Sequence, residues 1–161
     1  MSLMKRIAFA AAAVAIAAPS FAQTDRGEAK ATVAGKVVTI DYGRPSLKGR
    51  DMLGQAQVGQ AWRMGSGAAT TLKTDADLTF GAVSVPKGEY ILTATKTAED
   101  AWQLNVLAKA DRAKVVDVPL AFSKGADSVE VFTVDLAAQG SKGELKLTWG
   151  TTALKAAFTA K

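Results

Sequence analysis

The sequence contains neither cysteine nor histidine. Without cysteine the chain has no disulfide, no thiolate metal site, no cysteine nucleophile and no lipid-anchored cysteine. Without histidine, Ser-His-Asp catalysis, histidine-ligated zinc and histidine pH switches are excluded too. Hydrophobic residues make up 48% of the chain, which is normal for a globular protein. The composition therefore indicates a folded domain that lacks several of the usual catalytic groups.

Residues 1–22 have the pattern of a cleavable secretory signal. Lys5 and Arg6 form a basic start, and residues 7–18 form an apolar run that is short for a transmembrane helix. Small residues then precede a cleavage point after Ala22. We therefore expect a mature chain of residues 23–161, forming one domain in the periplasm or outside the cell.

The charge of the chain is mildly positive. The full sequence carries a formal net charge of +5, and cleavage of the signal would remove two of its basic residues. The remaining basic residues are spread singly, without the basic stripe and interleaved aromatics of a nucleic-acid surface. After the signal, no segment is apolar over the length that spans a bilayer. We expect neither nucleic-acid binding nor a membrane span in the mature chain.

Alternation of apolar and polar residues dominates the mature sequence, and helical periodicity is weak. Residues 143–150 alternate best, with Leu145, Leu147 and Trp149 on one face. Residues 89–96 and 101–108 predict a hairpin. About nine short strands at this spacing predict an all-β fold, an antiparallel β-sandwich of the jelly-roll kind. A closed β-barrel is the alternative.

The most distinctive feature is a long connection after the strand predicted at residues 36–42. It begins with D-Y-G-R-P-S-L-K-G-R and ends near W-R-M-G-S-G-A-A-T. Its cationic and aromatic residues could converge on a small anionic ligand, with an indole ring as a stacking face. The candidate binding residues are Arg44, Lys48, Arg50, Trp62 and Arg63.

A structural role is the other interpretation of this connection. In it, Arg44 or Arg63 pairs with Asp41 or Asp51 and holds an irregular loop against the sandwich, while Trp62 belongs to the core. Arginine–carboxylate clamps on long loops are common, so both interpretations stay open at this point.

These motifs also carry a resemblance. D-Y-G-R-P-S-L-K-G-R, W-R-M-G-S-G-A-A-T, P-K-G-E-Y, a mid-chain Trp102 and a late L-T-W are similar to the secreted bacterial family called domain of unknown function 2911. The resemblance extends from about Asp41 to Trp149. It implies an exported domain, and it implies no particular reaction.

Candidates for catalysis are weaker. Ser66 lies between two glycines but outside a Gly-x-Ser-x-Gly elbow, and its base would have to be a lysine. Asp41, Asp51 and Asp111 could supply a carboxylate pair, although no spacing selects one. Asp75 and Asp77 could share a cation, but a turn between strands explains them better.

Two functions are therefore compared below. The first is a non-catalytic domain that binds a small anionic ligand or a protein partner, without a cofactor or a metal. The alternative is a periplasmic hydrolase that uses carboxylates or a serine–lysine pair. A concave pocket lined by the cationic residues and free of carboxylates would favour binding, whereas two acids facing each other across a cleft would favour hydrolysis.

Overall fold

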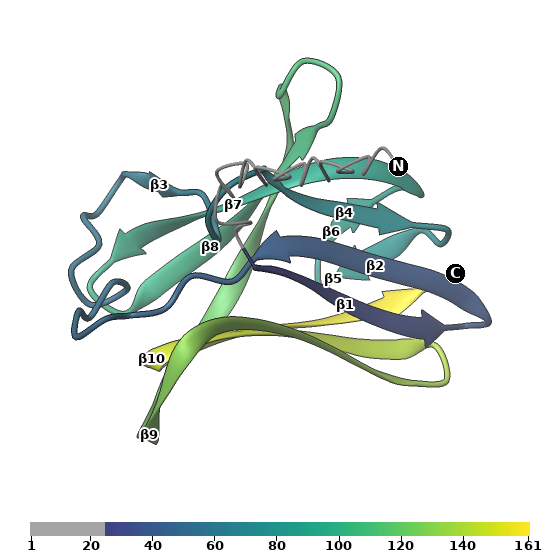
Figure 1. The fold of residues 1–161 in the computed structure, drawn as a ribbon. Helices are drawn as coiled ribbons and strands as arrows, with labels where there is room; N and C mark the ends of the chain where they lie inside the picture. Colours follow the sequence, from purple (N-terminus) through teal and green to yellow (C-terminus); the bar gives the residue numbers. More distant parts are fainter. Residues whose placement is uncertain (1–24) are drawn as a thin grey trace, which may run out of the picture.

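The computed structural model describes residues 25–161, and this part of the chain is built from strands and connecting loops without a helix (Figure 1). The predicted secretory signal lies outside the described residues. No segment of residues 25–161 is a helix able to cross a membrane. The strands are β1 (Arg26–Val33), β2 (Lys36–Gly43), β3 (Ala61–Trp62), β4 (Thr70–Thr74), β5 (Leu78–Phe80), β6 (Val83–Val85), β7 (Gly88–Ala98), β8 (Ala101–Ala108), β9 (Lys114–Gln139) and β10 (Lys142–Ala160).

The strands pair in the order β1-β2-β4-β7-β8-β9-β10-β5-β6, and β3 adds to β7. Every pairing is antiparallel. The early part of β9 pairs with β8, and its later part pairs with β10, so one strand passes from the first sheet into the second. Figure 1 shows these two layers facing each other. The predicted all-β sandwich is confirmed, and the order of strands does not close into the barrel that was its alternative.

The strands differ in length from the expected short ones. β9 runs without a break from Lys114 to Gln139 and β10 from Lys142 to Ala160, so residues 143–150 are only the first part of a much longer strand. The two strands bend together, because Gly150 has a φ of 62° and the register shifts on either side of it. Beyond the bend β10 returns to its own start, where the amide of Ala160 donates to the carbonyl of Ser141 at 2.8 Å. The polar sequence around the bend resembles a turn, and residues 125–128 of β9 have no partner in β10, although pairing resumes on either side of them.

The core lies between the layers, as the alternation predicted. Leu145, Leu147 and Trp149 are buried, and the polar residues between them are partly or fully exposed. Apolar residues that alternate along β7 and β8 face the same core. The aromatics predicted to be core residues are confirmed as buried. They are Phe80, Tyr90, Trp102, Phe132 and Trp149.

The long connection between β2 and β3 is a packed flap. Its beginning pairs with β9: the amide of Leu47 donates to Glu130 at 2.9 Å, and the amide of Phe132 donates to Pro45 at 2.9 Å. Leu47 and Leu53, which belong to the flap, are buried. The flap is therefore attached to the sandwich at its start, and it delivers Trp62 to the edge of β7.

Candidate functional site

The two motifs that stand out in the sequence meet in space. Gly43, at the end of β2, lies against the turn that follows Trp62, and a Cβ atom added to it would overlap the carbonyl oxygen of Ser66. A Cβ on Gly65 would likewise lie 2.6 Å from the carbonyl oxygen of Gly43, and Gly65 has a φ of 133°. Only glycine allows this approach of two backbones without displacement.

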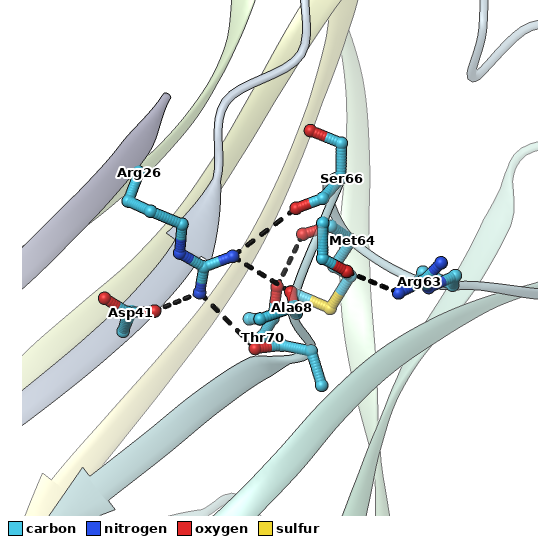
Figure 2. A network of polar contacts seen from close by, with 9 residues as sticks. Arg26, Asp41, Arg63, Met64, Ser66, Ala68 and Thr70 are labelled. Atoms are coloured by element: carbon cyan, nitrogen blue, oxygen red, sulfur yellow. Dashed lines mark hydrogen bonds and ion pairs between the residues drawn. The ribbon is translucent and has the colours of Figure 1, made fainter. Parts of the chain in front are cut away.

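Arg26 in β1 holds the same turn in place (Figure 2). Its guanidinium donates to the carbonyl of Ala68 at 2.9 Å and, at 3.4 Å, to those of Ser66 and Ala69. It also pairs with Asp41 of the neighbouring strand. One arginine thus joins β1, β2 and the turn of residues 64–69.

This arrangement corrects the clamp predicted from the sequence. Asp41 pairs with Arg26 rather than with Arg44 or Arg63, and Asp51 accepts the amide of Gly54 at 3.0 Å. The physical reason is the register of the β1–β2 hairpin. It places Glu28 opposite Asp41, so that Arg26, two residues away on the same face, is within reach of the Asp41 carboxylate.

Two shorter bonds complete the turn. The guanidinium of Arg63 donates to the carbonyl of Gly67 at 2.6 Å, and the hydroxyl of Thr70 donates to that of Met64 at 2.7 Å. Met64 is fully buried with a φ of 58°. The turn is therefore fixed from both sides before any ligand is considered.

Trp62 lies on top of an aromatic cluster. Its ring centroid is 5.0 Å from that of Phe132, 5.9 Å from that of Trp149 and 6.3 Å from that of Trp102. It stacks on Trp149 with an interplanar angle of 19° and meets the other two rings edge to face. These three neighbours are buried, whereas Trp62 is only half-buried. The ring thus has a core side and a side that can contact a ligand.

A cleft of about 580 Å³ opens beside Trp62. Of the described residues that line the cleft, only Arg63 carries a charge. The lining contains neither a carboxylate nor a lysine from residues 25–161. Three glutamines of the flap supply amide groups. The full lining is Pro45, Met52, Gln55, Ala56, Gln57, Gln60, Ala61, Trp62, Arg63, Gly65, Ser66 and Trp149.

The family model described as "Protein of unknown function (DUF2911)" matches residues 24–158, which includes both motifs at this cleft. The chain belongs to the DUF2911 family. The resemblance noted from the motifs is thereby confirmed. No curated protein and no solved structure gives a significant match. For this DUF2911 domain the function therefore has to be argued from the site itself.

The structure brings together only part of the predicted binding set. Trp62 and Arg63 line the cleft, whereas Arg44, Lys48 and Arg50 are exposed and do not line it. Within residues 25–161 none of these four cations forms an ion pair. Arg44 packs its aliphatic part near Gly27. Ligand contact by the three outlying cations stays a prediction that this geometry does not favour.

Three of the acids considered for catalysis or for a cation stabilise turns, and Asp41 pairs with Arg26. Asp77 accepts the amide of Lys87 at 2.8 Å, Asp111 accepts that of Ala113 at 3.0 Å, and Asp51 accepts that of Gly54. Between residues 25 and 161 no three Asp or Glu side chains gather into a group able to hold a metal ion. Sequence reasoning missed Arg26 and the three glutamines of the cleft. The hairpin register would have indicated Arg26, whereas the glutamines form no recognisable pattern.

Proposed function

We propose that this protein is exported and that its mature domain binds a small ring-shaped molecule in the cleft beside Trp62, without transforming it. Export is supported by the secretory pattern of residues 1–22. Binding is supported by the cleft described above, which combines one aromatic face with a few polar groups. Small-molecule sites generally have this make-up.

The lining of the cleft is the observation that carries the proposal. The exposed side of Trp62 offers a flat apolar surface for a sugar or aromatic ring. Gln55, Gln57 and Gln60 each offer an amide with two donor hydrogens and an acceptor oxygen, which suits hydroxyl or carbonyl groups on such a ring. The stacked Trp149 and the buried Phe132 support Trp62 from below, so the surface is preformed.

The same lining argues against hydrolysis as the function of this cleft. Ser66 is present, but among residues 25–161 neither a lysine nor a carboxylate lines the cleft to accept its proton. A pair of carboxylates for glycoside hydrolysis would need two acids about 5–10 Å apart across the substrate. Of the acids considered for that role, Asp41 pairs with Arg26, and Asp51 and Asp111 accept amides within turns; none of them lines the cleft.

Tryptophan fluorescence tests this function. Galactose, galacturonate, phenylacetamide and phenylacetate serve as ring probes, added to the mature protein and to Trp62→Ala. We expect at least one probe to change the emission of the parent saturably, and Trp62→Ala to lose that response.

Val58→Ala is the matched control, because Val58 belongs to the same flap, is 59% exposed and does not line the cleft. It should respond as the parent does. Absence of a saturable response to every ring probe would contradict the proposal. An unchanged affinity of Trp62→Ala for the ring probes, measured by ligand-observed NMR, would contradict it as well.

A further inference from the structure

We infer that the cleft recognises an oxyanion, a carboxylate or a phosphate, carried by its ring-shaped ligand, and that Arg63 and the backbone amides of the turn at residues 64–68 bind it. This inference rests on the proposed function and specifies the ligand class. The turn supplies amide hydrogens and the neighbouring Trp62 contacts the ring.

Four carbonyl groups of this turn already accept hydrogen bonds (Figure 2). Thr70 donates to the carbonyl of Met64, Arg26 donates to those of Ser66 and Ala68, and Arg63 donates to that of Gly67. In a trans peptide unit the carbonyl and the following N–H point in opposite directions, and residues 25–161 contain no cis peptide bond. The amide of Gly65 therefore points away from Thr70, and the amide of Gly67 points away from Arg26.

Within residues 25–161 these amides have no hydrogen-bond partner. Across the described chain, none of the N–H groups of residues 65–68 donates to a backbone or side-chain acceptor. Met64, Gly65 and Gly67 all have positive φ, at 58°, 133° and 73°. Successive N–H groups in such backbone conformations form a concave surface that binds anions.

The charge around the turn fits the same ligand. Arg63 lines the cleft, and its bond to Gly67 uses only part of the donor set of a guanidinium, which has five N–H groups. The hydroxyl of Ser66, another lining residue, adds a further donor. Because no carboxylate lines the cleft, nothing there repels an anion.

A cation, an amide surface and an aromatic face thus lie within six consecutive residues, from Trp62 to Gly67. Inorganic anions would use the first two and leave the ring face of Trp62 empty. We therefore expect the anionic group to belong to a ring compound, such as a sugar acid, an aromatic acid or a ring phosphate.

Matched probes test the inference. Galacturonate is compared with galactose, and phenylacetate with phenylacetamide, each pair differing in the charged group. Phenyl phosphate, inorganic phosphate and acetate distinguish phosphate from carboxylate and a ring ligand from a bare anion. We expect the acids to bind at least about 10-fold more tightly than their neutral partners, and acetate and inorganic phosphate to bind more weakly than the ring anions.

Arg63→Gln should lower the affinity for the acids by about 10- to 100-fold, because bonds to charged groups are the strong ones, and should leave neutral probes within about 3-fold. Arg50→Gln removes the same charge from the same flap outside the cleft and should leave both affinities unchanged. Equal binding of acids and neutral partners to the parent overturns the inference. An equal loss in Arg50→Gln and Arg63→Gln also overturns it, since it would indicate surface charge alone.

The comparison of acid with neutral probe uses the unmodified protein, so it stands even if Arg63→Gln disturbs the turn. Arg63→Lys keeps the charge and, in a folded variant, should regain a large part of the preference for acids. If it regains none, the inference fails. If no ring probe binds at all, the proposed function fails as well. If both members of each pair bind equally, only the inference of an oxyanion fails and the proposed function stands.

Discussion

Replacing Arg26 by alanine tests how the candidate site is held together. The substitution removes the ion pair with Asp41 and the bonds to the turn that carries Ser66 and Ala68. The side chains of Arg26 and Asp41 are 30% and 47% exposed, so water screens their attraction. Such a pair contributes about 0.5–1 kcal/mol to folding.

The bonds to the turn add to that figure. The bond to Ala68, at 2.9 Å, contributes about 1–1.5 kcal/mol, and the contacts at 3.4 Å contribute little. We expect Arg26→Ala to lower the free energy of unfolding by about 2 kcal/mol in total. A fully buried clamp, of the kind that the sequence motif allowed, would cost about 3–5 kcal/mol.

Urea unfolding of the parent and of Arg26→Ala measures this difference. The same measurement on Asp41→Ala and on the double variant gives the coupling energy between Arg26 and Asp41, which we expect to be about 0.5–1 kcal/mol. Arg44→Ala is the control, since Arg44 is exposed and forms no ion pair within the described chain. If Arg26→Ala is no less stable than Arg44→Ala, the guanidinium does not hold the turn. A loss above about 4 kcal/mol would show instead that the pair is desolvated far more than its exposure implies.

Three further predictions concern the glycine contact, one tyrosine and export. Gly43→Ala should destabilise the domain by about 2–4 kcal/mol in thermal unfolding, because the added Cβ meets the backbone of Ser66. Gly125→Ala is the control and should be nearly neutral, because no atom lies closer than 3.7 Å to its added Cβ. Equal melting temperatures of the two variants would refute the close approach. Burial, and then the nearby charge of Asp77, raise the pKa of Tyr90 above its ordinary value of 10.0. Its stabilising effect is thus complete below pH 10 and is lost as the pH rises through the raised pKa, so Tyr90→Phe should lessen the alkaline loss of stability, and an alkaline absorbance titration lacking a late tyrosine would contradict this. Expression in a Gram-negative host should give a periplasmic product starting at Gln23, and an intact mass that retains Met1 would disprove the signal.

The sandwich was predictable because alternation follows burial. Where one face of a strand packs on the core, as at Leu145 and Leu147, the sequence shows it residue by residue. The continuity of β9 was not predictable in the same way. Residues 123–128 of β9 are exposed, so no apolar alternation marks this part of the strand, although the facing part of β10 is buried or half-buried.

The candidate site was predictable only in part. Trp62 and Arg63 belong to a conspicuous motif, and the structure places both at the cleft. Arg44, Lys48 and Arg50 belong to the other motif, at the start of the same connection, and none of them lines the cleft; Lys48 itself has a φ of 51°. Closeness in sequence is a poor guide inside an irregular loop, whereas the hairpin register that connects Arg26 with Asp41 is a regular geometry.

The folded-over β9–β10 hairpin has a consequence for the rate of folding. The hairpins β1–β2, β7–β8 and β9–β10 join neighbouring segments and can zip from their turns. The second sheet is complete only when Ala160 pairs with Leu78, which lies far away along the chain. Pairings of such sequence separation must overcome a large loss of chain entropy, so all-β domains of this kind fold over about milliseconds to seconds. We therefore expect the refolding chain to gain local hairpins early and to protect the amides of β5 and β6 from hydrogen exchange last.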